Sequence, residues 1–218
     1  MMKGYLRRDT EGDSGLVPFF VMLGAMVVVI VAFVGLNQFI LVKEELPEDN
    51  GIYLDQQEIH FGDPYAILEI ENYGTIKIRL REDKAPEAVN NFRKLCNEGF
   101  YNGLTFHRVI SGFMIQGGDP NGDGTGGPGY TIPPETDNGL THERGAVAMA
   151  KRSGETRMSG SQFYICHQAA NHLDGEHTVF GSVVEGMDVV DGIAEVQTDA
   201  NDRPLDPVVI QKAYIVYE

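Results

Sequence analysis

The chain divides into an apolar run near its N-terminus and a longer region in which apolar and polar positions alternate. Val17–Leu36 reads "VPFFVMLGAMVVVIVAFVGL", and no charged residue occurs from Ser14 to Val42. Roughly 20 apolar residues are needed to cross the hydrocarbon core of a bilayer. The pattern therefore predicts a transmembrane anchor helix over residues 16–42, preceded by a short tail at 1–15.

A secretory signal peptide is the alternative interpretation of this run. The apolar region of a signal peptide is usually only about 7–15 residues long and ends at a small-residue cleavage site. Here the run is longer, and "NQFILVKEE" follows it without such a site. An uncleaved anchor is therefore favoured, with a cleaved, freely exported chain as the alternative.

The basic residues around the run predict its orientation. Lys3, Arg7 and Arg8 precede the run, whereas only Lys43 follows it before an acidic stretch. Basic residues near a membrane span tend to stay on the cytoplasmic side. We expect a single-pass membrane protein with its N-terminus in the cytoplasm and its large domain on the outer, extracytoplasmic face.

Beyond the run, a polar linker is expected to lead into one compact domain. Residues 43–64 are polar, acidic and interrupted by Pro and Gly, and the domain is expected over 65–218. "YAILEIENYGTIKIRL" contains two short alternating runs on either side of Asn72-Tyr73-Gly74, which is a hairpin signal. Further strands are expected at Leu104–Ile110, Phe113–Gln116, Ala146–Ala150, Gln162–Cys166, Thr178–Val183 and Val208–Tyr217.

Two segments of this domain have helical character. Pro86 suits a first helical turn, Ala88, Phe92 and Leu95 recur at helical spacing, and Gly99 is placed to end the helix. "GMDVVDGIAEV" at 186–196 predicts a second, shorter helix. Many short strands with Gly-rich turns and two helices predict a mainly β fold, a closed antiparallel barrel whose open ends the helices cover.

Charge and cysteine content narrow the classes of partner. The formal net charge is −15, and the three acids and three bases before the apolar run cancel. A nucleic-acid backbone or an anionic lipid surface is therefore not expected to bind the folded part. Cys96 and Cys166 are too few for a disulfide framework and lack metal spacing, so two free, buried thiols are expected, with a single disulfide left open.

Three features resemble catalytic or metal motifs without completing them. "DPNGDG" at Asp119–Gly124 resembles the start of a calcium loop, but the twelfth position is Tyr130 where a bidentate Glu is needed. His167, His172 and His177 recur every five residues, which places them on neither one helical face nor one strand face. No G-x-S-x-G elbow and no phosphate-binding Gly-Lys-Ser/Thr occurs. We expect no metal and no cofactor.

The stretch "FHRVISGFMIQGGDP" at 106–120 places a permanent cation inside an apolar segment. In a strand, Arg108 and Ile110 point to one face while His107 and Val109 point to the other. Met114 and Gln116 likewise share a face, so a guanidinium and a carboxamide can converge beside apolar groups. Taken alone, the pattern also fits an arginine that pairs with a carboxylate at the rim of the sheet.

The blocks that accompany this stretch favour a specific family. "FHRVISGFMIQGGDP", "AMA" at 148–150, "GSQFYI" at 160–165 and "HLDGEHTVFGSV" at 172–183 follow one another in order. Together they resemble the cyclophilin family of peptidyl-prolyl isomerases over roughly residues 65–218. The resemblance implies an eight-stranded barrel capped by two helices, and an enzyme that speeds rotation about X–Pro bonds in proline-containing polypeptides.

The resemblance also implies roles for individual residues. Arg108 matches the catalytic arginine, with Gln116 as its polar neighbour and Phe113 beside them. Backbone groups of Ala150 and Lys151 are expected to bind the substrate chain, and His107 is expected to support the strand. The full set of expected substrate-binding residues is His107, Met114, Ala150, Lys151, Gln162, Tyr164, His172, Leu173 and His177.

The chain departs from the common family pattern at three places. His172 stands where Trp is frequent, so weak cyclosporin binding is expected, and Tyr164 stands where Phe is usual. "KRSGETRMSG" at 151–160 differs in charge from the commoner Asn-rich version, so the residue preference around proline is open. The alternative function is a membrane-tethered chaperone or scaffold of the same fold in which isomerisation is incidental.

Overall fold

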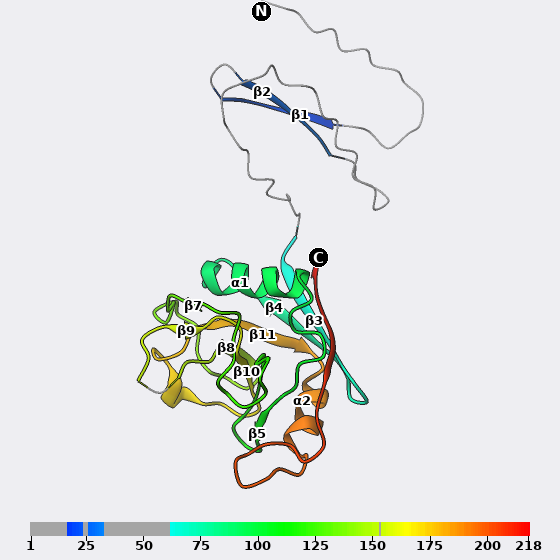
Figure 1. Cartoon of the computed structure of the whole chain (residues 1–218). Coiled ribbons are helices and arrows are strands. Elements are labelled where there is room, and N and C mark those ends of the chain that lie inside the picture. The colour runs from blue at the N-terminus through cyan, green and yellow to red at the C-terminus, as the bar shows by residue number, and fades with distance from the viewer. Residues whose placement is uncertain (1–16, 24–25, 33–61, 153) are drawn as a thin grey trace, which may run out of the picture. The chain divides into compact units, whose positions relative to one another are not determined.

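A computed structural model describes residues 17–23, 26–32, 62–152 and 154–218 of the chain (Figure 1). The chain separates into two compact units, Met1–Gln56 and Gln57–Glu218. The domain boundary expected from the sequence lies inside the second unit. In that unit the backbone N–H of Asp63 donates to the carbonyl of Glu218 at 2.8 Å, so residues expected to end the linker already pair with the C-terminus.

The described part of the N-terminal unit consists of two strands, where the sequence predicted a helix over 16–42. β1 (Val17–Leu23) and β2 (Met26–Ala32) pair antiparallel, with Val17 opposite Ala32. Both strands are rich in Val, Ile and Phe, side chains that favour extended backbone. The rest of the predicted anchor lies outside the described residues. Among the helices of the described ranges, none has the length and apolar character needed to cross a bilayer.

Eight strands of the second unit form one antiparallel sheet that curls into a half-barrel. In sheet order they are β12 (Ile210–Tyr217), β3 (Pro64–Ile70), β4 (Gly74–Leu80), β11 (Val179–Glu185), β8 (Ala146–Met149), β10 (Phe163–Cys166), β6 (Met114–Gly117) and β5 (Arg108–Ile110). A separate small pair is formed by β7 (Thr131–Ile132) and β9 (Met158–Ser159). The mainly β fold and the hairpin around Asn72 are confirmed, with strand ends shifted by a few residues.

The prediction of a closed barrel is wrong, because the end strands β5 and β12 do not pair with each other. The strand expected over 104–110 is regular only from Arg108. Before it, Thr105 makes an isolated bridge to Val209. The outer edge of β5 bonds to a loop and not to β12, because the N–H of Val109 donates to the carbonyl of Asp202 at 2.8 Å. A loop therefore takes the place that β12 would need to close the ladder.

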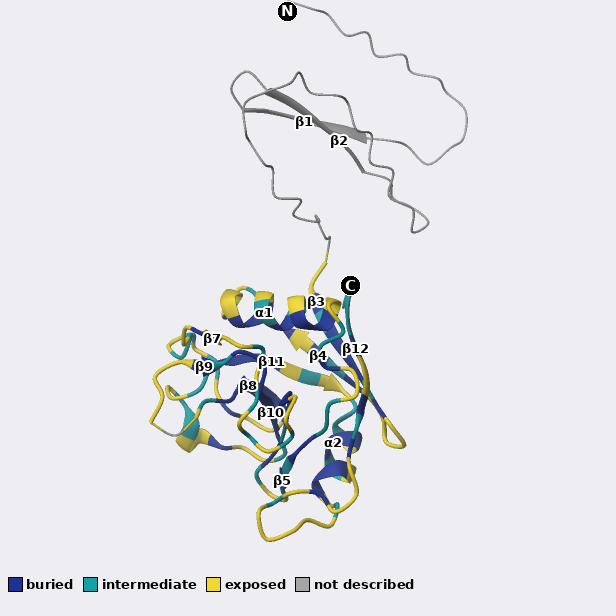
Figure 2. Cartoon of the chain, viewed as in Figure 1, coloured by how far each residue is buried: buried dark blue, intermediate teal, exposed yellow. Residues whose placement is uncertain are grey.

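Both expected helices are present and cover the sheet. α1 (Pro86–Asn97) buries Ala88, Val89, Phe92, Leu95 and Cys96, and α2 (Met187–Ala194) buries Val189, Val190, Ile193 and Ala194. Figure 2 shows that each helix turns one face inward and leaves the other exposed. The start of α1 has no side-chain cap of its own. The Glu135 carboxylate instead accepts the N–H groups of Glu87 and Ala88 at 3.1 and 2.9 Å, which stabilises the positive end of the helix.

Aromatic rings from distant segments meet in the main core. The ring of Phe92 on α1 lies 4.9 Å from that of Tyr101, 5.3 Å from Phe163 and 5.2 Å from Phe180, centroid to centroid. Cys96 and Cys166 are both free and buried, as expected. Burial raises the pKa of each thiol to about 12, so both are protonated and unreactive at neutral pH.

Candidate active site

The central strands β6, β10 and β8 are buried on both faces because each face packs against a different cluster. Ile115, Phe163, Ile165 and Val147 belong to the main core. The residues that alternate with these along the strands belong to a second, smaller cluster, against which Phe113 and Leu173 pack. Its buried members are Met114, Ala146, Ala148, Ala150, Tyr164, Cys166, Ala170 and Val179. The face opposite the main core is therefore the apolar base of the candidate site.

Strand register brings the catalytic candidates together on this second face. Arg108 on β5 lies directly opposite Gln116 on β6, and Gln116 lies opposite Tyr164 on β10. Directly opposed residues in an antiparallel pair have their Cβ atoms about 5 Å apart. The convergence of a guanidinium and a carboxamide that the alternation predicted is therefore realised.

These residues surround a hollow of about 290 Å³. Its lining contains the predicted residues Arg108, Phe113, Met114, Gln116, Ala150, Lys151, Tyr164, Leu173 and His177, together with Arg152. The walls are mainly apolar and the polar groups stand at the margin. Such a hollow fits a small apolar ring better than a charged group.

Arg108 is held at the margin of the hollow through one atom. Its Nε donates to Asp202 Oδ2 at 3.3 Å, and its side chain is 43% exposed. Asp202 adopts a left-handed backbone conformation with φ of 64°. Its carbonyl accepts the N–H of Val109, so the same residue bonds the strand and the guanidinium. No other hydrogen bond of the Arg108 side chain occurs among the described residues, which leaves its terminal NH₂ groups for a ligand.

A fixed arrangement of amides lies beside Arg108. The Gln162 NH₂ donates to the carbonyls of Gly124 and Gly126 at 3.0 and 2.9 Å. The carbonyl oxygen of Gln162 must therefore accept, and it accepts the NH₂ of Gln116 at 3.0 Å. Gln162 thus orients Gln116 from outside the first hollow. It lines a second hollow of about 550 Å³, which shares Gln116, Ala150, Lys151 and Arg152 with the first.

Two predicted histidines lie near the hollow without lining it. The ring of His172 lies 5.7 Å from the ring of Phe113, centroid to centroid. His107 directly precedes β5 and is only 7% exposed. Neither of its ring nitrogens has a hydrogen-bond partner among the described residues. Burial lowers the pKa of His107, so the ring is neutral at neutral pH.

Backbone and side-chain contacts at the opposite wall limit what the remaining residues can bind. The N–H of Ala150 donates to the carbonyl of Gln162 at 2.9 Å, and the carbonyl of Ala150 accepts the N–H of Ser159 at 2.7 Å. A carbonyl has two lone pairs, so Ala150 retains an acceptor for a substrate N–H but no donor. Lys151 pairs with Glu176 at 2.8 Å, and this bond lowers the pKa of the Glu176 carboxyl.

His177 is neutral and held by the backbone. Burial lowers its pKa, and its Nδ1 donates to the carbonyl of Met149 at 3.2 Å. Because the carbonyl can only accept, the proton is on Nδ1, and Nε2 is an acceptor.

The calcium-like loop at 119–124 is organised by its own backbone. Asp119 is 1% exposed, and its carboxylate accepts the N–H groups of Asn121, Asp123 and Gly124. Those donors occupy the oxygens that a cation would need. Among the residues the structure describes, no group of three or more metal-ligating side chains comes together.

Three contributors to the site were missed from the sequence. Arg152 directly follows the predicted residue Lys151, and its charge in the sequence was the signal that could have identified it. Asp202 is 94 positions from Arg108 and gave no signal. His142, fully buried, bonds the hydroxyl of Tyr164 from 22 positions away. Only the fold brings these pairs together.

The site therefore defines a class of protein: a β half-barrel with a mostly apolar hollow and positively charged donors at its edge. The family model described as cyclophilin type peptidyl-prolyl cis-trans isomerase/CLD matches residues 65–215. The chain belongs to this family and is a cyclophilin-type peptidyl-prolyl cis-trans isomerase.

Relatives and solved structures agree with this assignment. Peptidyl-prolyl cis-trans isomerase B of Bacillus subtilis (strain 168) is 55% identical over 125 residues, which are 57% of this chain and 85% of that protein. A peptidyl-prolyl cis-trans isomerase of Helicobacter pylori (strain ATCC 700392 / 26695) is 51% identical over 134 residues, covering 60% and 80% of the two chains. The crystal structure of a Cryptosporidium parvum cyclophilin type isomerase in the presence of the dipeptide Ala-Pro superposes with a TM-score of 0.67. It is 32% identical and covers 71% of this chain and 99% of that one.

Proposed function

We propose that the 290 Å³ hollow holds the proline ring of a polypeptide while Arg108 lowers the barrier to rotation about the preceding peptide bond. The observation that carries this proposal is the position of Arg108, which lines the hollow with only Nε engaged. The Ala-Pro dipeptide named with the Cryptosporidium parvum structure supports a proline-containing substrate.

The chemistry explains why an arginine suits this position. Amide resonance gives the C–N bond partial double-bond character and a rotation barrier of about 18–20 kcal/mol. As the bond twists, the proline nitrogen becomes pyramidal and regains a lone pair, which a donor can engage. Arg108 is always charged and presents several N–H groups. Its hydrogen bond is strongest to the twisted state, which is the condition for catalysis.

Other residues of the hollow have supporting roles in this proposal. Phe113, Met114 and Leu173 hold the pyrrolidine ring and exclude water, which strengthens the contact with Arg108. The carbonyl oxygen of Gln116 is free to accept an N–H of the substrate, because its NH₂ is bound to Gln162. No bond is made or broken, so the reaction needs neither a nucleophile nor a metal.

The direct test compares two arginine variants of the full-length chain in detergent micelles. A hydrogen bond from a charged donor contributes about 1.5–3 kcal/mol. Arg108→Ala is therefore expected to lower kcat/KM on an Ala-Pro peptide at least about 10-fold. Arg79→Ala is the control, because Arg79 lies on β4 and pairs with Asp63; this substitution should leave kcat/KM unchanged. Equal activity of the two variants would refute the proposed role of Arg108.

We further propose that the uncharged run within 16–42 anchors the domain to a membrane and leaves the domain on the outer face. The length of the run and the basic residues before it support this. In hydrocarbon, two paired strands leave unpaired backbone groups along their outer edges, so in a bilayer the run would have to be helical.

Membrane fractionation tests the anchor. The full-length chain is expected to resist extraction by alkaline carbonate. Val29→Lys, which places a charge mid-run at a cost of about 2.5–3.5 kcal/mol, should weaken retention, whereas Gln38→Lys near its end should not. Protease added to sealed, right-side-out vesicles should digest the domain. A carbonate-soluble chain of reduced mass would instead identify a cleaved, exported enzyme.

Weak cyclosporin binding is part of the same proposal. His172 lies beside Phe113 at the position where related enzymes often have Trp. An imidazole offers less apolar surface than an indole, so His172→Trp is expected to raise cyclosporin affinity while the isomerase rate stays within about twofold. Inhibition curves for the two proteins provide the measurement.

A further inference from the structure

Three side chains behind the hollow form a hydrogen-bonded chain that the rotation chemistry does not use. His142 Nδ1 lies 2.7 Å from Asp174 Oδ1, and His142 Nε2 lies 2.9 Å from the hydroxyl of Tyr164. The ring of His142 is fully buried, and Tyr164 is 4% exposed. Such a chain inside a protein is not incidental, because every buried polar group in it needs a partner.

The direction of each hydrogen bond follows from the chemistry of the groups. The bond from His142 lowers the pKa of Asp174, so the carboxylate is ionised and can only accept. His142 Nδ1 therefore carries the proton. The Tyr164 hydroxyl has a proton that it can donate to His142 Nε2, which lies 2.9 Å away. Burial raises the pKa of Tyr164, so the hydroxyl retains its proton.

The hydrogen bonds among Tyr164, His142 and Asp174 connect two walls of the hollow that come from different parts of the sequence. Tyr164 belongs to β10, whereas Asp174 directly follows the short 3₁₀ helix η1 (Asn171–Leu173), whose Leu173 lines the hollow. The backbone of His142 strengthens the connection. Its N–H donates to Asp174 Oδ1 at 2.8 Å, and its carbonyl accepts the N–H of Ala170 at 2.7 Å.

His142 also supports the hollow through ring contacts. Its ring is nearly parallel to that of Tyr164, at 13° and 5.9 Å between centroids. His177, which lines the hollow, presents its edge to both rings, at 6.4 Å from His142 and 5.6 Å from Tyr164. One buried imidazole therefore contacts two residues of the lining and fixes a third through Asp174.

We propose that His142 and Asp174 are positioning residues that act through Tyr164 to hold the proline-binding hollow in its binding shape. The inference rests on the proposed function of the hollow. These three hydrogen-bonded residues do not contact Arg108. They therefore affect the affinity for the proline ring equally in every state of the reaction. Loss of such uniform binding raises KM and leaves kcat nearly unchanged.

A double-mutant cycle on the full-length chain in detergent tests this. His142→Phe keeps a ring but leaves the Tyr164 hydroxyl buried without an acceptor, so KM is expected to rise roughly 5- to 50-fold. Tyr164→Phe removes that hydroxyl and should change KM less than about threefold. In the Tyr164→Phe background, His142→Phe should then add less than about twofold. Exchange NMR on an Ala-Pro peptide separates binding from the rate of isomerisation.

Coupling in KM distinguishes positioning from a general loss of stability. Effects of His142→Phe and Tyr164→Phe that simply add, or a fall in kcat with unchanged KM, would overturn the inference. Tyr101→Phe is the matched control, because it removes a buried tyrosine hydroxyl, bonded to the Ser161 carbonyl at 3.3 Å, from the main core. It should lower the melting temperature without changing KM.

A measurement on the unmodified chain keeps the inference testable should His142→Phe fail to fold. The ¹⁵N shifts of His142 are expected to show a proton on Nδ1, facing Asp174 and protected from exchange. A ring protonated on Nε2 would overturn the inference. The proposed function fails separately, since it depends on Arg108→Ala; an inactive Arg108→Ala with an additive cycle would reject the positioning role alone.

Discussion

Arg108 makes its ion pair through Nε, and this atom determines which part of the guanidinium faces a substrate. With Nε bound to Asp202, the N–H groups of the two terminal nitrogens remain available to a substrate. The pair is about 40% exposed, so it contributes little to stability. Its value is geometric, because it limits the orientations of a long side chain. The ion pair with a carboxylate at the rim is therefore compatible with the proposed catalytic role of Arg108.

This geometry predicts different results for two substitutions. Asp202→Ala frees the guanidinium but retains the charge, so kcat/KM is expected to fall only about two- to fivefold. Arg108→Lys retains the charge but replaces the planar fork with a single ammonium group on a more flexible stem. It should lose at least about 10-fold. Proline-limited refolding assays on both variants provide the measurement, and an Asp202→Ala loss as large as that of Arg108→Lys would contradict it.

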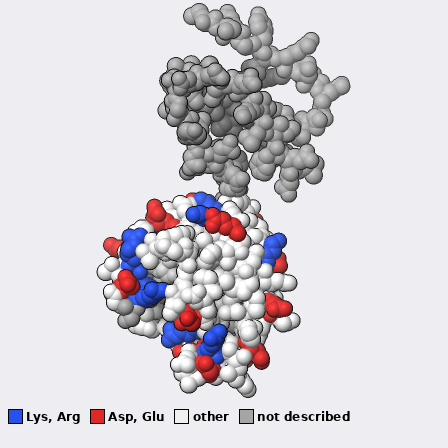
Figure 3. Space-filling model, in the orientation of Figure 1, with Lys and Arg blue, Asp and Glu red and all other residues white. Residues whose placement is uncertain are grey.

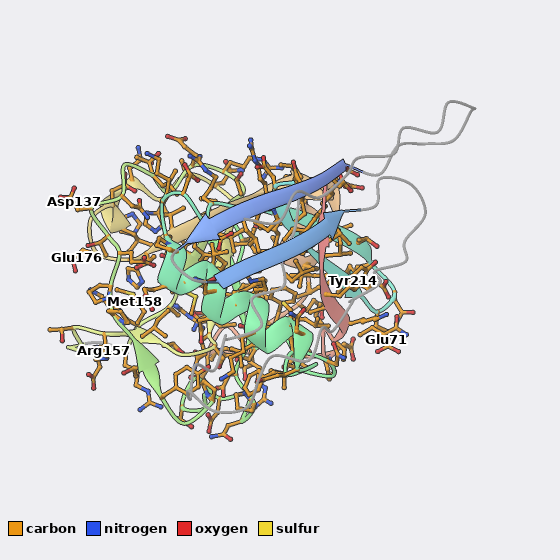
Figure 4. All side chains as sticks on the ribbon, turned by 90° about the horizontal axis from the view of Figure 1, so that it is seen from above. Glu71, Asp137, Arg157, Met158, Glu176 and Tyr214 are labelled. Atoms are coloured by element: carbon orange, nitrogen blue, oxygen red, sulfur yellow. The ribbon has the colours of Figure 1, made fainter. Side chains whose placement is uncertain are left out.

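At the scale of elements, the segment from Ala150 to Ser159 gives the groove its charge. Lys151 and Arg152 line both hollows, and Arg157 lines the second, against a single acid, Glu155. The Arg157 Nε donates to the Thr131 hydroxyl and not to a carboxylate. Figure 4 places Arg157 on the same side of the domain as Glu176 and away from Tyr214. This basic rim stands out in a chain whose net charge is −15.

The basic rim predicts a preference for acidic substrates. An exposed ion pair contributes up to about 1 kcal/mol. A peptide with Glu close to the X–Pro bond is therefore expected to show about two- to fivefold higher kcat/KM than its Lys counterpart at low salt. The difference should shrink in 0.5 M salt, where the Debye length is only a few ångströms.

Charge-reversal variants provide the control for this prediction. Arg152→Glu with Arg157→Glu should abolish or invert the preference. Lys212→Glu, on β12 and outside both hollows, should leave it unchanged. A preference that survives the double reversal would assign the selectivity to another part of the groove.

Most elements, but not all their contacts, could be predicted from the sequence. Alternation and turn residues located the eight strands of the main sheet and both helices to within a few residues, because these signals are local. The open edge between β5 and β12 was not predicted, since it depends on Asp202 bonding Val109 from a distant loop. The buried set of Tyr164, His142 and Asp174 was missed for the same reason: its members are 22 and 32 positions apart.

The residues that line the hollow could be predicted where they form a contiguous motif. Arg108, Phe113, Met114 and Gln116 lie within nine consecutive positions, and strand alternation alone predicts which of them share a face. Lys151 was predicted at the site, whereas Arg152 was visible only as a charge and its place beside both hollows was not predicted. Glycine positions show most clearly that long-range contacts cannot be predicted from the sequence. Gly186 separates β11 from α2 with φ of 87°, and a Cβ there would lie 2.2 Å from the carbonyl oxygen of Thr75.

At the scale of the whole molecule, charge is spread over the surface, whereas two largely buried histidines are neutral. Figure 3 shows acidic and basic groups side by side around a mostly uncharged middle on the face in view. Inside, His107 and His177 both have a pKa lowered mainly by burial. The fold therefore holds two neutral imidazoles that the unfolded chain would protonate in mildly acidic solution.

The sign of the resulting pH dependence follows from proton uptake. An unfolded histidine takes up a proton below its ordinary pKa of about 6.5. The folded rings stay neutral to lower pH, so the unfolded state binds more protons and the free energy of unfolding falls as the pH drops below about 6.5. Each ring contributes at most about 1.4 kcal/mol per pH unit. Carboxylates such as Asp174, whose pKa is lowered, change the free energy of unfolding only below about pH 4, outside this window.

Urea unfolding of the unit Gln57–Glu218 between pH 7 and pH 5.5 measures this effect, with tyrosine fluorescence as the signal because the chain has no Trp. The unfolding midpoint of the unmodified unit is expected to fall through this range. The double variant His107→Gln/His177→Gln should show a flatter dependence, whereas His172→Gln, which removes an exposed histidine, should retain the original slope. A midpoint that stays constant from pH 7 to pH 5.5 would mean that the buried imidazoles take up protons in the folded state as readily as in the unfolded one.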